Sequence, residues 1–218
     1  MEVTVSIYGK ELKGFKKEIN KATLETCKKI NKKIKLEDFA IVYEENPQMC
    51  IPGFGHGGKT LSAYLIYIYL NPKFKNFKNK VIKEEIPRAI AHEIIHLVRW
   101  NLFKPMQKNL LHTIIEEGLC QHFELEVFGE NSKLYPWSMA LKENEIKKYL
   151  KRAKKYFDSR DISLIYSWKF GNKKLKIPRW AGYSLGFHLI KKYLEKTNKK
   201  VSEIYRLDAK KIFDELNI

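Results

Sequence analysis

Two histidines, a glutamate and two isoleucines form the sequence His-Glu-Ile-Ile-His at residues 92–96 of this 218-residue chain. In a helix, residues four apart lie on one face, so His92 and His96 can direct their imidazoles at a single metal ion. Glu93 stands beside the first histidine, where a carboxylate could take a proton from a water molecule on that metal. Zinc held by neutral imidazoles and one carboxylate, with one position left open, forms a hydrolytic site.

The residues around this motif favour a buried helix. Its apolar neighbours are Ile90, Ala91, Ile94, Ile95, Leu97 and Val98. Polar groups left unpaired in an apolar setting cost roughly 1–3 kcal/mol each. Two histidines and a glutamate on such a helix therefore need a partner, and a metal ion would serve. A helix with surface histidines and a solvated glutamate is the alternative, and the apolar neighbours argue against it.

A second helix is expected over about residues 107–127, after a connection short enough to favour antiparallel neighbours. Glycine costs about 1 kcal/mol in a helix interior. Gly118 in the middle of this helix therefore suggests the close approach of another backbone, and we expect the histidine helix to be that neighbour. We predict Glu117 as the third ligand, which completes the two-histidine, one-glutamate set of catalytic zinc.

Four other residues of the second helix could lie near such a metal. Glu116 projects about 100° away from Glu117 and could instead hold a ligating histidine in the right tautomer. His112 and His122 are weaker ligand candidates, for which an ordinary structural or exposed histidine is the favoured interpretation. Cys120 could approach the metal, although a small buried filler is favoured.

His-Glu-x-x-His followed by Glu-Gly-Leu at 117–119 resembles the gluzincin metallopeptidases. Together with Tyr135-Pro136-Trp137 and the sequence Pro-Arg-Trp-Ala-Gly-Tyr-Ser-Leu-Gly at 178–186, it is similar to an uncharacterised family of predicted zinc-dependent proteases. The resemblance covers roughly residues 50–215 and implies peptide-bond hydrolysis. The chain departs from the expected pattern at Cys120, where alanine is expected.

This activity needs further groups besides the ligands. Glu93 is the predicted general base, which would pass the proton of water to the leaving amine. An electrophile should stabilise the oxyanion, and gluzincins commonly use a tyrosine or a histidine there. Tyr183 is our candidate, with a core tyrosine as the alternative; Arg179 and His188 are lesser candidates. We expect one zinc per chain and a peptide or protein substrate.

A rival motif occupies Gly53–Thr60, where Gly-Phe-Gly-His-Gly-Gly-Lys-Thr fits the phosphate-binding loop pattern. Such a loop follows a buried strand and opens a helix. Here Pro52 precedes the motif, the residues at 61–70 are strand-like, and no apolar run ends in a magnesium-binding aspartate. Nucleotide binding is the weaker alternative. We interpret the segment as a loop with His56 exposed, and the following strand as a sheet edge that could bind an extended peptide.

The formal net charge of +17 comes mainly from lysines scattered along the chain. Such a charge could attract nucleic acid, and a basic nucleic-acid-binding protein with a structural zinc is a further alternative. The scatter, and the scarcity of arginine with its planar fork, favour a general lysine bias over specific nucleic-acid binding.

The remaining sequence features predict a cytoplasmic protein without a membrane anchor. The N-terminus lacks the pattern of a signal peptide. The longest apolar run, Leu61 to Leu70, is too short to span a bilayer as a helix. Cys27, Cys50 and Cys120 are odd in number and far apart, so no disulfide framework is expected and the thiols should be reduced.

The order of elements predicts a single α+β, zincin-like domain over 1–218. A small mixed sheet with helices should occupy 1–78, and a mainly helical part carrying the metal site should occupy 79–218. Strands are expected at 2–8, 39–43, 61–70 and 162–168, and helices besides the two motif helices at 11–34, 143–156 and 180–196, with two short ones at the end.

Overall fold

The computed structural model describes residues 1–104, 107–129, 132 and 134–218. These residues form two compact units, Met1–Asn101 and Leu102–Ile218. The first unit holds a four-stranded sheet and the second is mainly helical, so the predicted α+β class is confirmed. Within the described ranges, no helix combines the length and the apolar character that crossing a membrane requires.

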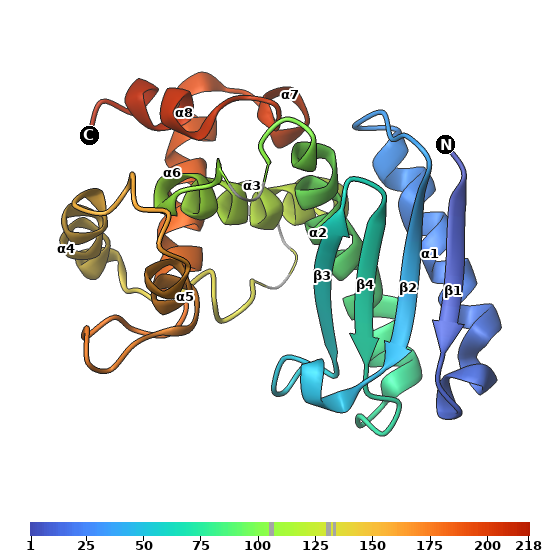
Figure 1. The fold of residues 1–218 in the computed structure, drawn as a ribbon. Helices are drawn as coiled ribbons and strands as arrows, with labels where there is room; N and C mark the ends of the chain where they lie inside the picture. Colours follow the sequence, from blue (N-terminus) through green and yellow to red (C-terminus); the bar gives the residue numbers. More distant parts are fainter. Residues whose placement is uncertain (105–106, 130–131, 133) are drawn as a thin grey trace. The chain divides into compact units, whose positions relative to one another are not determined.

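The sheet of the first unit is mixed, as predicted, and its strands run in the order β1-β2-β4-β3 (Figure 1). β1 pairs with β2 and β2 with β4 in parallel, whereas β3 pairs with β4 in antiparallel orientation. β3 is therefore an edge strand of the sheet. The strands span Val3–Tyr8 (β1), Phe39–Glu45 (β2), His56–Ser62 (β3) and Leu65–Leu70 (β4).

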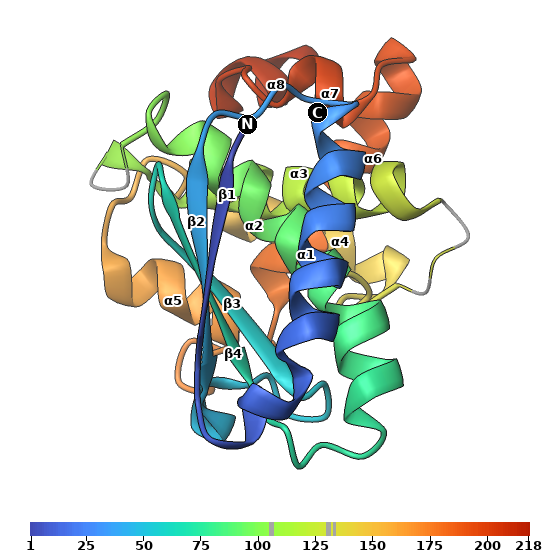
Figure 2. The same cartoon turned by 90° about the vertical axis from the view of Figure 1, so that its right-hand side faces the viewer.

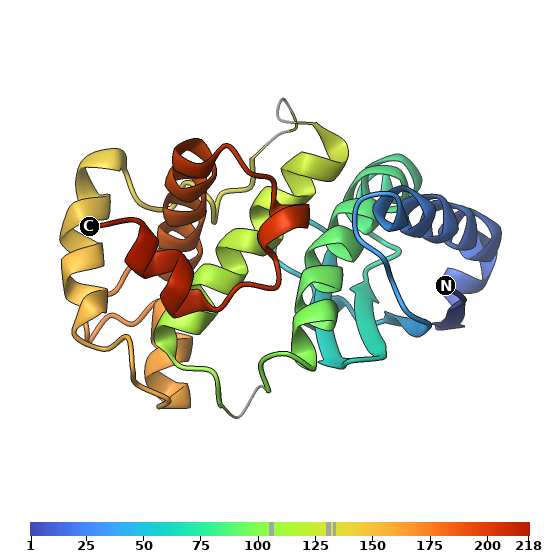
Figure 3. The ribbon, with the colours of Figure 1, turned by 90° about the horizontal axis from the view of Figure 1, so that it is seen from above.

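Two long helices, α1 and α2, cover one face of this sheet (Figures 2 and 3). Leu24 on α1, although apolar, is 43% exposed. Thr23 is buried instead, and its hydroxyl lies 2.5 Å from the hydroxyl of Tyr43 on β2. The helices are α1 (Lys16–Asn31) and α2 (Ile86–Trp100), with short 3-10 helices at Glu11–Phe15 and Pro47–Met49 and a π-helix at Lys78–Glu85.

The loop predicted over 53–60 and the single strand predicted over 61–70 are partly wrong. The chain forms β3 before residue 63, turns at residues 63–64, and returns as β4. The Ser62 hydroxyl accepts a hydrogen bond from the Tyr64 amide at 3.2 Å, which supports this turn. β4 lies inside the sheet, so the edge is β3 and not the strand that follows the predicted loop. Lys59 and Thr60 lie within a strand, whereas a phosphate-binding loop would open a helix there.

The second unit is built around the crossing of α3 and α6 (Figure 1). A Cβ atom added at Gly118 on α3 would lie 2.2 Å from the carbonyl oxygen of Gly186 on α6. The close backbone approach predicted from Gly118 is therefore confirmed, and the helix that makes it within this unit is α6. The helices span Leu110–Phe128 (α3), Glu143–Lys154 (α4), Ile162–Phe170 (α5), Ala181–Thr197 (α6), Val201–Ile204 (α7) and Ala209–Glu215 (α8).

The strand predicted at 162–168 is wrong, because these residues form helix α5. Asp161 caps this helix, and its carboxylate accepts hydrogen bonds from the amides of Ser163 and Leu164. An aspartate at this position satisfies amides that a helix start leaves without partners. The apolar residues that alternate along 162–168 suggested a strand, and the cap at Asp161 favours the helix. Gly171, with φ of +89°, ends it.

The contact between α3 and α6 gives a prediction for stability. We expect Gly118→Ala to lower the free energy of unfolding by roughly 1–3 kcal/mol, the usual cost of overpacking. The reason is that the new methyl group would meet a backbone carbonyl, which moves only if the helices part. Urea denaturation followed by circular dichroism measures the change.

Gly14→Ala is the matched control, because an added Cβ at Gly14 meets no atom within 4 Å. Equal denaturation midpoints for the two variants would contradict the account of the α3–α6 contact.

Candidate metal centre

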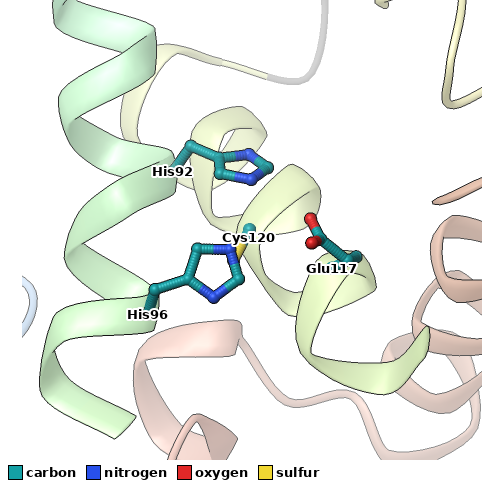
Figure 4. A group of neighbouring side chains, drawn as sticks. All are labelled: His92, His96, Glu117 and Cys120. Atoms are coloured by element: carbon teal, nitrogen blue, oxygen red, sulfur yellow. The ribbon is translucent and has the colours of Figure 1, made fainter. Parts of the chain in front are cut away.

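The two histidines of α2 lie on successive turns of one helix face, as their spacing predicts. Pro87 stands in the first turn of α2, where its missing N–H costs no helical hydrogen bond. His92 and His96 are half-buried, and their ring centroids are 5.3 Å apart (Figure 4). The helix therefore presents two imidazoles together, whereas the residues between them belong to the core.

Glu93 is buried, with 7% of its surface exposed, and it lies against the edge strand β3. The hydroxyl of Thr60 lies 2.8 Å from Oε2 of Glu93 and 2.9 Å from its backbone carbonyl oxygen. A Cβ atom at Gly58 would lie 2.7 Å from Oε1 of Glu93. Two residues of the glycine-rich segment thus accommodate this carboxylate: Gly58 by having no side chain, and Thr60 by donating a hydrogen bond.

His56 was expected to be exposed, and that prediction is wrong. Its side chain is buried at the start of β3. Nδ1 of His56 lies 3.5 Å from the carbonyl oxygen of Phe54 and 3.9 Å from Oε2 of Glu85, and its ring meets the Phe54 ring edge-on. These contacts give His56 a structural place within the first unit.

Glu117 and Cys120 lie one turn apart on α3, and both are buried. Only 2% of the surface of Glu117 is exposed. The helix that carries them begins at a cap formed by Asn109, whose side chain accepts a hydrogen bond from the His112 amide at 2.9 Å. An ionised carboxylate with so little access to water needs compensating charge or hydrogen bonds.

Lys169 on α5 supplies such a charge, and it is a residue that sequence reasoning missed. Its Nζ atom lies 2.7 Å from Oε1 of Glu117 and 5.3 Å from the centroid of the Tyr183 ring. Burial by itself lowers the pKa of Lys169, but Glu117 and Tyr183 raise it well above its ordinary value. No motif marks this lysine, and it follows the stretch that was expected to be a strand.

The other candidate residues of the second helix have structural partners. Glu116 accepts hydrogen bonds from Nζ of Lys108 at 2.8 and 2.6 Å through its two oxygens. His112 packs edge-on against Phe103. His122 donates from Nε2 to the carbonyl of Phe187 at 2.8 Å, and burial lowers the pKa of His122 to about 4. The favoured interpretation of His122, a structural histidine, agrees with these contacts.

Arg179 and His188 were the lesser candidates for stabilising an oxyanion. The Arg179 guanidinium lies 4.1 Å from the centroid of the Trp180 ring. His188 is half-buried on α6, and burial followed by the nearby charge of Lys191 lowers its pKa. Tyr183, in contrast, lies near Glu117 through Lys169, whose Nζ atom approaches both side chains.

Four side chains make a group that could hold a metal ion: His92, His96, Glu117 and Cys120 (Figure 4). Each offers one ligand atom, an imidazole nitrogen, a carboxylate oxygen or a thiol sulfur. The group contains the three residues predicted as ligands, and it adds Cys120, for which a filler role was favoured. Nitrogen, oxygen and sulfur donors of these kinds are the ones that bind zinc in proteins, so the donor set fits zinc.

Comparison with known proteins points to the same metal. A family model described as predicted Zn-dependent protease (DUF2268) matches residues 16–214. The chain is 26% identical over 178 residues to "Uncharacterized protein YjfC" of Bacillus subtilis (strain 168), covering 77% of this chain and 54% of that protein. It is 29% identical over 133 residues to "Uncharacterized protein YjaZ" of the same organism, covering 59% and 50%. The chain thus spans about half the length of these relatives. No solved structure matches it.

The contact between Thr60 and Glu93 gives a second prediction. We expect Thr60→Val to lower the free energy of unfolding by roughly 1–3 kcal/mol, because it removes a donor from a buried carboxylate without changing the size of the side chain. Thr60→Ser keeps the hydroxyl and serves as the control. Urea denaturation of both variants tests this expectation, which fails if the valine variant is as stable as the serine variant.

Proposed function

The chain belongs to the family of predicted Zn-dependent proteases, and from this membership we propose that it hydrolyses peptide bonds with one zinc ion held by His92, His96 and Glu117. The observation that carries the proposal is the composition of the metal-binding group, together with the buried carboxylate of Glu93 next to its first histidine. This is the ligand set and the base expected of a gluzincin.

Two imidazoles and one carboxylate leave a position open on zinc, and catalytic zinc sites need that position. Cys120, as a fourth ligand, would close the site in the manner of a structural zinc. We therefore place Cys120 beside the metal and not on it. Its complete burial suits the small apolar filler that free cysteine often is.

Each polar group of the site then has a role in hydrolysis. When bound, zinc would supply Lewis-acid activation of water and of the scissile carbonyl. Glu93 would accept the proton of water and deliver it to the leaving amine. The Thr60 hydroxyl holds Oε2 of Glu93, so Oε1 is the oxygen that would take the proton. Tyr183 would donate its hydroxyl hydrogen to the oxyanion.

The edge strand β3 is the proposed place for the substrate backbone. β3 pairs with β4 along one side; on its other side the His56 carbonyl accepts a hydrogen bond from the Ile51 amide, and the stretch after His56 could accept an extended peptide as an added strand. Gly58, the third residue of β3, adjoins Oε1 of Glu93. A peptide that pairs with β3 would therefore pass near the proposed base. From the sequence we expected the strand over 61–70 to bind an extended peptide. We now propose the preceding strand, β3, for this role.

The division of roles between base and ligands is the third prediction. Glu93→Gln should keep zinc and lower the hydrolysis of a fluorogenic peptide library by about 10²–10⁴-fold, the usual contribution of acid–base catalysis. His92→Ala combined with His96→Ala should lose the metal, because two of its three ligands are removed.

Metal analysis by mass spectrometry and peptide hydrolysis are measured on the same preparations. Zinc that remains in the double variant would exclude the proposed ligands. Full activity of Glu93→Gln would exclude Glu93 as the base.

The choice of Glu117 over Glu116 is the fourth prediction. Glu117→Gln should weaken zinc binding by more than the roughly 10–100-fold that loss of a supporting residue costs, because it removes a ligand. Glu116→Gln is the matched control from the neighbouring position, and its effect should be modest because Glu116 pairs with Lys108. Competition with a chelator measures both affinities. Equal or reversed affinities would show that Glu117 is not the ligand.

A further inference from the structure

We propose that Lys169 is a positioning residue that orients both the third zinc ligand, Glu117, and the oxyanion donor, Tyr183. This inference rests on the function proposed above. Lys169 stands in the last turn of α5, Glu117 on α3 and Tyr183 in the first turn of α6. One ammonium group therefore joins side chains from three helices of the second unit.

The contacts of Lys169 are those of a built site. Its Nζ atom lies 2.7 Å from Oε1 of Glu117 and 5.3 Å from the centroid of the Tyr183 ring. The lysine side chain is 23% exposed and that of Glu117 is 3% exposed. In such a partly dry setting an ion pair persists only with good geometry and further hydrogen bonds. Fixed geometry is what a residue needs if it is to orient its partners.

The backbones of the same residues are also tied together. The Lys169 carbonyl accepts a hydrogen bond from the amide of Trp180 at 3.0 Å, which joins the end of α5 to the start of α6. Nε2 of Gln121 donates to the carbonyl oxygens of Glu117 and Tyr183, each at 3.0 Å. Hydrogen bonds thus hold the backbones of Lys169, Glu117 and Tyr183 to their neighbours, and the Lys169 side chain adds a further connection.

The chemistry of an ammonium group determines what Lys169 can do here. It has three N–H donors and no acceptor, so in a hydrogen bond between Lys169 and Tyr183 the phenol oxygen would accept. The hydrogen of the Tyr183 hydroxyl would then point away from Lys169, where it could be donated to a substrate oxygen. In its contact with Glu117, Lys169 takes Oε1, and a carboxylate offers a second oxygen to a metal.

The matched control is the neighbouring pair of Lys108 and Glu116. Lys108 likewise joins a buried glutamate of α3, with distances of 2.8 and 2.6 Å to its two oxygens. Lys169→Met and Lys108→Met therefore each remove one lysine from a buried ion pair on the same helix. Only the first of them touches a proposed zinc ligand.

The first measurement is zinc affinity, by competition with a chelator. Lys169→Met should lower the affinity about 10–100-fold, as expected for loss of a residue that orients a ligand. Lys108→Met should keep the wild-type affinity. An unchanged affinity in Lys169→Met would overturn the inference. So would tighter binding, since the ammonium would then repel the metal more than it orients the ligand.

The second measurement tests the connection to Tyr183 at saturating zinc. Lys169→Met and Tyr183→Phe should each lower kcat with little change in KM. The double variant should be no slower than Tyr183→Phe alone, because Lys169 then acts through a hydroxyl that is gone. Losses that multiply in the double variant would overturn this part. If Lys169→Met does not fold, Lys169→Gln removes the same charge, keeps an N–H donor, and must show the same loss of zinc affinity.

The failure of this inference differs from the failure of the proposed function. Wild-type protein that binds no zinc, or that binds zinc and cleaves no peptide, would exclude the protease. If the protein is a zinc-dependent protease but Lys169→Met leaves its zinc affinity unchanged, only the proposed role of Lys169 is excluded.

Discussion

The burial of carboxylates near the candidate metal centre is the constraint on which the rest of the structure depends. Glu93, Glu116 and Glu117 are almost completely buried. A charged carboxylate removed from water is costly unless hydrogen bonds or opposite charges compensate it. Each of the three has such a partner: a hydroxyl from β3 for Glu93, Lys108 for Glu116 and Lys169 for Glu117. The packing of α2 against β3, and of α5 near α3, brings two of these partners close.

Small residues make these approaches feasible. Gly58 lets the edge strand lie against the Glu93 carboxylate, and Gly118 lets α3 contact α6 at Gly186. That second contact sets the distance between the helix that carries Glu117 and the helix that carries Tyr183. The backbone contact between Gly118 and Gly186 therefore affects the position of Glu117, which directly precedes Gly118. Other glycines of the segment 53–60 make close approaches elsewhere in the first unit: Gly55 to the Phe74 side chain and Gly57 to the Met49 carbonyl.

The helical period in the sequence pointed to residues that can gather around one point. His92, His96 and Glu117 were selected from that period and from their apolar neighbours, and all three belong to the group of side chains that could hold a metal ion. Lys169 could not be found in this way, because its role comes from a contact between helices far apart in the chain. The helix that carries it was mistaken for a strand, since alternating apolar residues outweighed the cap at Asp161. The approach of α6 to Gly118 could not be predicted for a similar reason: a glycine signals a close approach but not which helix approaches.

The central claim is that zinc is held by two imidazoles and one carboxylate, with an open position and with Cys120 outside its coordination. X-ray absorption at the zinc edge of the purified protein tests this claim most directly, because zinc lies about 2.3 Å from sulfur but about 2.0–2.2 Å from nitrogen or oxygen. The account predicts a shell of nitrogen and oxygen only, with the signature of two imidazoles. A sulfur neighbour at the longer distance would contradict it, and would make the centre a closed, structural zinc site.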